Sequence, residues 1–296
     1  QFNLGAIYMS EKYELLNINK ALYYLSLAAE NKIPQASFNI GVIYEMGKYI
    51  KKDIKKAIHY FTIAADHNIR EAQYNLAIIY EKGEFIEQDI EKSIHYLSLA
   101  ANQHDPNASN HLGIIYLNGK YIKQNINKSI YYFSQAANQN HQRAQFNLGL
   151  VYYFGLNSPQ DIQKGIQYIM LASINGDRMA NFAHGFLLHE GKNVKRDIIE
   201  AIKFYKEASC FNNQYAKNNL GIIYKNGYGE KIKGKAGNAI VYFVEAIRQK
   251  HDYLSMYNLA HIYIYDETIQ HDINKSIELL IQSSYHFNHS IILLCI

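Results

Sequence analysis

Thirteen histidines are the side chains of this sequence with the broadest capacity for chemistry. His184 and His189 stand five residues apart, and Glu190 follows the second of them. A helical zinc-protease motif needs two histidines four residues apart with a glutamate beside the first, so that both imidazoles reach one metal ion. His59 and His95 are 36 residues apart, which indicates inheritance through a repeated unit. The sequence therefore predicts no metal site and no cofactor.

Nucleophiles and phosphate-binding loops are the other common signatures of catalysis. The sequence has no Gly-rich phosphate loop and no nucleophile elbow of the Gly-x-Ser-x-Gly type. Its two cysteines, Cys210 and Cys295, are too few for a disulfide framework and form no paired metal-ligand set. We therefore predict no catalytic residues and expect that the chain is not an enzyme.

A six-residue phrase organises the whole chain: Asn-Leu, a small residue, two apolar residues and Tyr, as at 75–80. The small residue, Gly or Ala, stands at positions 5, 41, 77, 113, 149, 185, 221 and 260. The first seven positions are 36 residues apart, and the eighth follows after 39. A fixed period of this length predicts stacked supersecondary units that contact mainly their neighbours. Residues 1–296 are thus expected to form a single array of about eight repeats.

Residues 34–68 show what one unit contains. Pro34 suits the first turn of a helix, and Gly47 suits the left-handed residue that ends one. Between them, small or apolar residues recur with helical spacing at 36, 40, 41, 43 and 44. Asp53 can cap a second helix, which carries apolar or small residues at 57, 60, 61, 64 and 65. The unit is therefore predicted to be an αα-hairpin, and the fold all-α.

The small positions are expected to let the two helices of a hairpin approach closely. We predict that the second-helix tyrosines fill the space beside them, at 24, 60, 96, 132 and 168. Gly113→Leu should then overpack the contact and cost about 1–3 kcal/mol of stability. An unchanged thermal unfolding curve for that variant would contradict this packing.

The order of residues within a unit resembles the Sel-1-like repeat, a relative of the tetratricopeptide repeat. Residues 144–152 read Ala-Gln-Phe-Asn-Leu-Gly-Leu-Val-Tyr, and a Gly follows three residues later. An Asp, a Lys beside small or apolar residues, a Tyr and an Ala pair recur in the second half of the units. The resemblance covers essentially the whole chain, and the fold class expected is a right-handed α-solenoid superhelix of αα-hairpins with period 36.

Several positions depart from the pattern that this resemblance implies. The family often has a second Gly two residues after the loop Gly, where this chain has Tyr49, Phe85 and Tyr121. Leu188 replaces the Tyr of its unit, and Asp266 stands where a loop Gly is expected. The loop at 227–237 carries an insertion of about two residues. These departures concern the shape of loops.

In this family the first helices are expected to line a concave groove. Residues three before, one after and four after each small position would then face a bound partner. The ten residues predicted to form this groove are Phe38, Glu45, Tyr74, Glu81, Phe146, Tyr153, Phe182, His189, Lys225 and Tyr257. Aromatic side chains supply large contact areas at protein interfaces. The alternative is that these rings pack against neighbouring repeats.

A column of asparagines lies two residues before the small positions, at 3, 39, 75, 147, 219 and 258. Such a ladder of amides could bind an extended peptide backbone. The favoured alternative is an intramolecular hydrogen bond that fixes the pairing of helices.

The function that the resemblance implies is a non-catalytic scaffold or adaptor, which binds a partner protein or peptide along the groove. The alternatives are a regulatory repeat region of a larger enzyme, such as a kinase, and an adaptor in endoplasmic-reticulum-associated degradation. A helical-repeat RNA binder is a more remote alternative. The net charge of +4 is too small to indicate nucleic-acid binding, so no nucleic-acid partner is expected.

The ends and the composition give weaker indications. The sequence starts inside the recurring phrase and stops where a ninth copy would begin, so an array truncated at both ends is expected. Uncapped ends predict end-to-end self-association. No apolar run is long enough for a membrane-spanning helix. Few cysteines favour a cytoplasmic location, with a secretory lumen as the alternative.

Overall fold

The structure is a computed structural model that describes residues 1–9, 17–156, 159–227, 235–250 and 252–284. In these ranges the chain forms sixteen α-helices and no β-strand. In the first half of the chain the helices are α1 (Phe2–Met9), α2 (Ile18–Glu30), α3 (Pro34–Met46), α4 (Ile54–Asp66), α5 (Arg70–Lys82), α6 (Ile90–Asn102), α7 (Pro106–Asn118) and α8 (Ile126–Ala137). In the second half they are α9 (Gln142–Phe154), α10 (Ile162–Ile174), α11 (Arg178–Glu190), α12 (Ile198–Cys210), α13 (Gln214–Asn226), α14 (Ala236–Lys250), α15 (Tyr253–Tyr265) and α16 (Ile273–Ser284).

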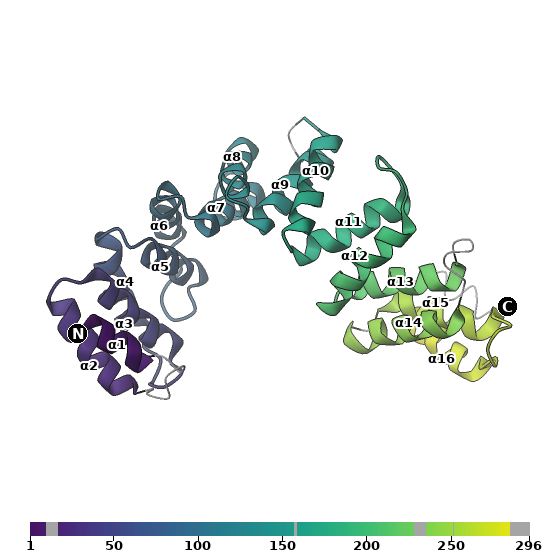
Figure 1. The fold of residues 1–296 in the computed structure, drawn as a ribbon, viewed down its shortest axis with the longest axis horizontal. Helices are drawn as coiled ribbons and strands as arrows, with labels where there is room; N and C mark the ends of the chain where they lie inside the picture. Colours follow the sequence, from purple (N-terminus) through teal and green to yellow (C-terminus); the bar gives the residue numbers. More distant parts are fainter. Residues whose placement is uncertain (10–16, 157–158, 228–234, 251, 285–296) are drawn as a thin grey trace. The chain divides into compact units, whose positions relative to one another are not determined.

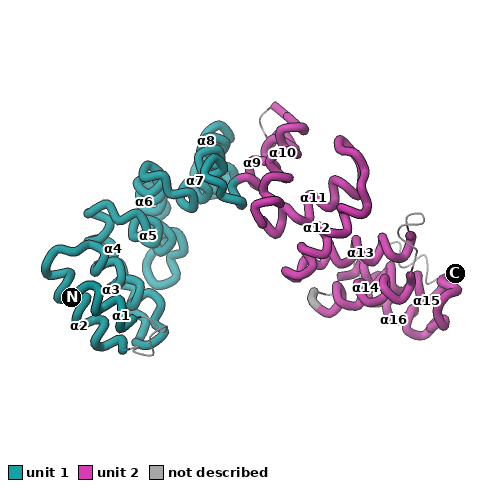
Figure 2. The backbone as a smooth tube through the Cα atoms, in the orientation of Figure 1, with its two compact units in different colours: residues 1–144 teal, residues 145–296 magenta. Residues whose placement is uncertain are grey.

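Consecutive helices pair into hairpins, and within each part of the chain these pack one after another, as Figure 1 shows. The first helix of every hairpin carries the small position, and the second helix packs beside it. The predictions of an all-α fold and of consecutive αα-hairpins are confirmed. The chain divides into two compact units, residues 1–144 and 145–296, which are coloured separately in Figure 2. We refer to them as unit 1 and unit 2.

Short polar signals set where each helix starts and stops. Asp53 has extended backbone geometry, and its Oδ1 accepts the backbone N–H of Lys56 at 3.0 Å. This hydrogen bond satisfies one of the free amides at the start of α4. Gly47 ends α3 with φ of 62°, in the left-handed region that favours glycine. Gly83 and Gly119 end α5 and α7 in the same way, so the loops repeat with the period of the sequence.

The core of a hairpin forms where the small position meets one large residue of the second helix, twenty positions later in most repeats and 22 positions later after Gly221. A Cβ atom added to Gly41 would lie 2.6 Å from Cδ1 of Phe61. Gly113 has the same relation to Phe133, and Gly221 to Phe243. Ala77 shares its core cluster with Leu97, a smaller side chain than phenylalanine. In these hairpins the bulkier Phe stands opposite Gly and the smaller Leu opposite Ala, whereas Gly5 and Gly149 meet Leu25 and Ile169.

The prediction that the second-helix tyrosines fill this space was wrong by one residue. Tyr60 instead stacks on Tyr44 of the first helix, with ring centroids 6.1 Å apart and planes within 7°. The ammonium of Lys56 lies 5.0 Å from the centroid of the Tyr44 ring, at a distance that permits a cation–π interaction. The same stack joins the two helices of five further hairpins, in the pairs 8–24, 80–96, 116–132, 152–168 and 224–242.

Among the described helices, none combines the length and the apolar character needed to cross a membrane. The described residues also contain no group of three or more histidine, cysteine, aspartate or glutamate side chains placed to hold a metal ion.

Candidate protein-interaction surface

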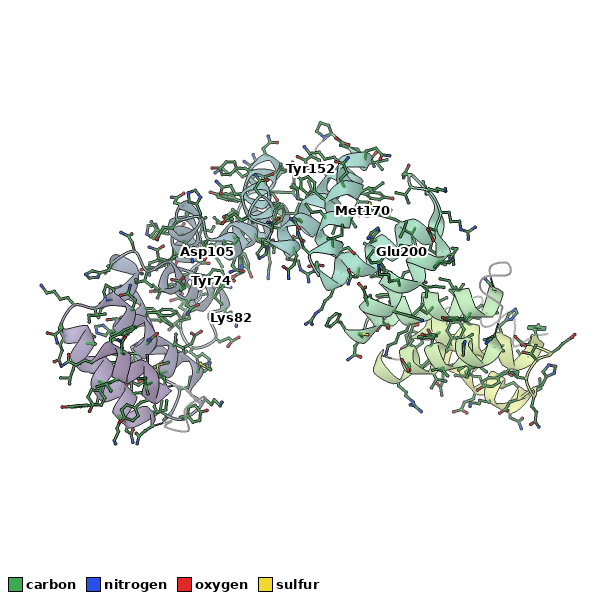
Figure 3. All side chains as sticks on the ribbon, in the orientation of Figure 1. Tyr74, Lys82, Asp105, Tyr152, Met170 and Glu200 are labelled. Carbon is green, nitrogen blue, oxygen red and sulfur yellow. The ribbon has the colours of Figure 1, made fainter. Side chains whose placement is uncertain are left out.

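The odd-numbered helices each present one exposed stripe, which we call the outer stripe. It contains the residues six and two before the small position, and one and five after it. In α5 these residues are Glu71, Asn75, Ile78 and Lys82, of which the first and last are exposed. Figure 3 shows Lys82 at the end of this helix. The spacing of three and four residues places all four side chains on one helix face.

The predicted groove residues that precede the small positions by three lie beside the outer stripe, where they contact the core. Phe38 packs on Phe61, with ring centroids 5.8 Å apart. The ring of Tyr74, labelled in Figure 3, packs edge to face with that of His111 in the next repeat, with ring centroids 6.4 Å apart. Phe146 is buried and belongs to a core cluster of unit 2, whereas Tyr257 is half-buried. These contacts favour the packing alternative for Phe38 and Phe146 in particular.

The predicted residues four after the small position form no uniform surface. Glu45 is half-buried, and burial raises the pKa of its carboxyl against the opposing effect of Lys52 and Lys82. Glu81 accepts a hydrogen bond from Nε2 of His111 at 2.7 Å, if that nitrogen carries the proton. Both groups are thus already engaged with neighbouring parts of unit 1.

The corresponding residues in unit 2 differ in burial, and only His189 is buried. Tyr153 is half-buried and meets Phe154 edge to face, with centroids 5.1 Å apart. His189 is buried, and burial lowers the pKa of its imidazole. Burial also lowers the pKa of Lys225, and the carboxylate of Asp266 partly offsets this. Of the ten predicted groove residues, Phe146 and His189 are therefore buried, and the other eight are half-buried.

Two members of the asparagine ladder form the intramolecular hydrogen bonds that the sequence favoured. Nδ2 of Asn219 donates to the hydroxyl of Tyr205 at 3.0 Å. Nδ2 of Asn258 donates to Oδ1 of Asn218 in the preceding repeat at 3.2 Å. At these positions the amides connect helices and hold them in register.

Unit 2 carries an aromatic patch, formed by Phe182, Phe186 and Tyr215. Phe182 lies at its base, with ring centroids 6.3 Å from Phe186 and 6.0 Å from Tyr215. Phe186 is 46% exposed and Tyr215 is 58% exposed. Below them, the buried Tyr205 supports Phe182 from α12 at 6.0 Å. Two exposed rings on a rigid aromatic base have the character of an interface anchor.

Only Phe182 of this patch was among the predicted groove residues. Phe186 and Tyr215 occupy the outer stripe, one after and six before their small positions. Other exposed apolar residues of the outer stripe in unit 2 are Phe154, Met179, Leu254 and Tyr265. The column of Tyr215 varies in residue type along the array, whereas the column of Phe186, one after the small position, is among those predicted to face the groove.

His184 occupies a column that is Ile or Leu in every other repeat, at 4, 40, 76, 112, 148, 220 and 259, and that is buried in all of them except the first. Its ring is buried against Phe204 with centroids 4.0 Å apart, and its Nδ1 lies 3.2 Å from Oγ of Ser173. The hydroxyl of Ser173 donates a hydrogen bond to Oδ1 of Asn181 at 2.7 Å. Nδ1 of His184 is therefore the donor in its hydrogen bond to Oγ of Ser173. Burial lowers the pKa of His184, an effect that Glu200 opposes and Lys203 reinforces.

This lowered pKa makes unit 2 sensitive to acid. The unfolded chain binds a proton at His184 when the pH falls through the ordinary histidine range, at about pH 6.5, whereas the folded chain resists protonation. Stability is therefore fully present above this range and is lost as the pH falls below it. We expect His184→Leu to reduce the loss of unfolding free energy between pH 7.5 and 5.5, and to add up to about 1 kcal/mol at pH 7.5. Denaturant unfolding at the two pH values measures both effects.

The buried His189 leaves part of the pH dependence in place, because its pKa is also lowered. His59→Leu, at an exposed position on α4, is the control and should leave the pH dependence unchanged. An equal pH dependence in wild type and His184→Leu would show that the folded state protonates His184 without cost.

The fold and the outer stripe define a class: a repeat protein built from αα-hairpins whose first helices carry an exposed stripe. A family model of the Sel1 repeat matches residues 1–32, 34–69, 70–105, 106–141, 142–177, 178–210, 214–251 and 254–286. These eight matches cover nearly all of the sequence, and the chain belongs to the Sel1 repeat family. Sel1 repeat proteins are generally protein-interaction scaffolds and typically non-catalytic.

Solved structures share the fold. The c5321 protective antigen of uropathogenic Escherichia coli, described as displaying an SLR fold, matches 99% of the chain with a TM-score of 0.87 at 23% identity. The chain spans 62% of that protein's length. A Sel1 repeat protein from Oxalobacter formigenes matches 84% of the chain with a TM-score of 0.73 at 27% identity, and 99% of its own length is covered. A comparison with curated protein sequences finds no match.

Proposed function

We propose that the chain is a non-catalytic scaffold that binds a partner protein through the outer stripe of unit 2, centred on the aromatic patch. The observation that carries this proposal is the pair of half-exposed rings, Phe186 and Tyr215, seated on Phe182. Covering such rings with a partner removes apolar surface from water, at about 25 cal/mol for each Å². A fixed base holds the rings in place, so little side-chain entropy is lost on binding.

The chemistry of the stripe selects the partner. Around the patch, Met179, Leu254 and Tyr265 are also exposed, so the matching surface is apolar, as on one face of an amphipathic helix. Lysine and arginine are sparse along the stripe, where Lys82 and Arg143 occur. The residues six before the small positions are Gln35, Glu71, Asn107, Arg143, Met179, Tyr215 and Leu254. A single Arg in seven positions favours a protein over RNA, which needs repeated cations along its phosphates.

The proposal is tested by comparing partners captured by three forms of the chain. The double variant Phe186→Ala with Tyr215→Ala should weaken binding of a captured partner at least about tenfold, equal to about 1.4 kcal/mol. Tyr131→Ala is the matched control, because Tyr131 on α8 is 57% exposed, close to the 58% of Tyr215. Affinities are measured by calorimetry with the purified partner. Equal affinities for wild type and the double variant would refute the placement of the site.

A cytoplasmic adaptor is the setting that we propose for this scaffold. The cysteine Cys210 is free and exposed, which suits a reducing compartment. Localisation of a tagged full-length protein decides between this compartment and a secretory lumen.

A further inference from the structure

Unit 1 contains a cavity at the loop edge of the hairpins, away from the outer stripe. It has a volume of 580 Å³ and is bounded by the residues around the start of α4, by α2 and by the loop after α5. Four lysines line it: Lys51, Lys52, Lys55 and Lys56. Its apolar walls are formed by Leu22, Ile50, Ile54 and Phe85, among others. We call it the lysine cavity.

The positive charge of the lysine cavity is incompletely balanced. Asp53 is the one carboxylate among its lining residues, against four ammonium groups. Its Oδ1 caps α4, and its Oδ2 lies 4.0 Å from Nζ of Lys56. Glu45 lies near Lys52 outside the lining, where it is half-buried. Lys51 and Lys55 are exposed, so their charges are available to a ligand.

Aromatic rings hold two of the lysines at the cavity. Nζ of Lys52 lies 4.6 Å from the centroid of the Phe85 ring, and Nζ of Lys56 lies 5.0 Å from that of Tyr44. Phe85 comes from the following repeat and is 59% exposed. It stands where related repeats often have a second loop glycine, so this wall exists because of a departure of this chain from the pattern. Apolar contact and positive charge are thus brought together in one concave place.

We propose that the lysine cavity binds an acidic segment of a partner protein, with a carboxylate among the lysines and an adjoining apolar side chain against Ile50, Ile54 and Phe85. Charge complementarity and the apolar walls both support this ligand. The site is independent of the aromatic patch and lies in the other unit.

The neighbouring loops argue against a long polyanion. Glu84 and Glu87 flank Phe85 in the next loop and are exposed, and Lys120 and Lys123 follow in the loop after that. A phosphate backbone that followed the loop edge would meet the two glutamates directly after the lysines, and like charges repel. A short acidic segment can occupy the lysine cavity without reaching them.

The test uses a fluorescein-labelled ten-residue peptide that alternates glutamate with leucine or phenylalanine. Its binding to the full chain is followed by fluorescence anisotropy at low and moderate salt. We expect saturable binding that weakens with salt, and at least about tenfold weaker binding by the double variant Lys51→Glu with Lys55→Glu. Lys192→Glu with Lys195→Glu is the matched control in unit 2, because Lys195 has the same repeat position as Lys51. That control should retain wild-type affinity, and circular dichroism checks the folding of both.

Four results would overturn the proposal. The first three are no binding of the peptide, equal affinity of the Lys51→Glu/Lys55→Glu variant for it, and equal binding of a peptide that has glutamine in place of glutamate. The fourth is tighter binding of oligouridine or of phosphatidylserine vesicles, if the Lys51→Glu/Lys55→Glu variant abolishes that binding. The last would identify a phosphate ligand instead. The double variant Phe186→Ala with Tyr215→Ala should leave the affinity for this peptide unchanged. The proposals for the lysine cavity and for the aromatic patch are therefore tested separately.

Discussion

Replacing Gly113 with alanine is expected to lower the free energy of unfolding by about 2 kcal/mol, although the change adds one methyl group. The added Cβ would lie 2.5 Å from both Cδ1 and Cε1 of Phe133. Phe133 is fully buried, so its ring has no free space into which it can move. Either the ring leaves its preferred rotamer or the two helices of the hairpin separate, and both cost packing energy.

A second substitution should rescue the first. Phe133→Leu combined with Gly113→Ala recreates the pair that repeat 3 already contains, Ala77 with Leu97. We expect the double variant to be more stable than Gly113→Ala alone, while Phe133→Leu alone costs about 1 kcal/mol through the cavity that it leaves. A double-mutant cycle from denaturant unfolding gives the coupling energy. Strictly additive effects would show that the two side chains do not share one space.

Removing the partner of a buried lysine is the second change with a large expected effect. Lys217 on α13 is 6% exposed, and its Nζ lies 3.3 Å from Oε2 of Glu245 on α14. Glu245→Gln leaves this ammonium buried without its counter-charge, so we expect a loss of about 2 kcal/mol. Lys217→Met should cost less than about 1 kcal/mol, because repeat 8 has Met256 at the same position.

Unfolding by denaturant, with amide hydrogen exchange of α13 and α14, measures this difference. The control is Glu200→Gln, because Glu200 pairs with Lys203 at 3.2 Å on the exposed surface of α12, where an ion pair contributes less than about 1 kcal/mol. If Glu245→Gln and Glu200→Gln are equally mild, water reaches Lys217 in solution.

The sequence was sufficient to predict the hairpins, because the period fixes which residues are small, which are apolar and where helices stop. Pro34, Gly47 and Asp53 each occupy the position that their chemistry predicts. The prediction from the sequence was wrong about the residue that packs on Gly41: it named Tyr60, and the structure has Phe61. Adjacent residues on a helix differ by 100° in direction, and the crossing of the two helices decides which of them meets the glycine.

The candidate site was harder to predict for the same reason. Phe146 and His189 contact second-helix residues of their own repeats, since Phe146 clusters with Ile169 and His189 lies against Tyr205. Their chemical types suited a groove, but the structure buries them. Tyr215 lies in a column that is exposed at six of its seven positions, whereas Phe186 is the one exposed member of a column that is otherwise half-buried. The exposure of Phe186 therefore depends on its local packing, which the repeat pattern alone does not contain.

The pairing of Gly113 with Phe133 also bears on how such a chain changes its length. Both residues fall within one repeat, 106–141, and so do the stacked rings of Tyr116 and Tyr132. A duplication or deletion of 36 residues copies or removes each complementary pair intact, and no orphaned glycine or unmatched ring remains. The gene can therefore gain or lose whole hairpins without first repairing their interiors, and selection can act at once on the outward-facing residues of the new copy.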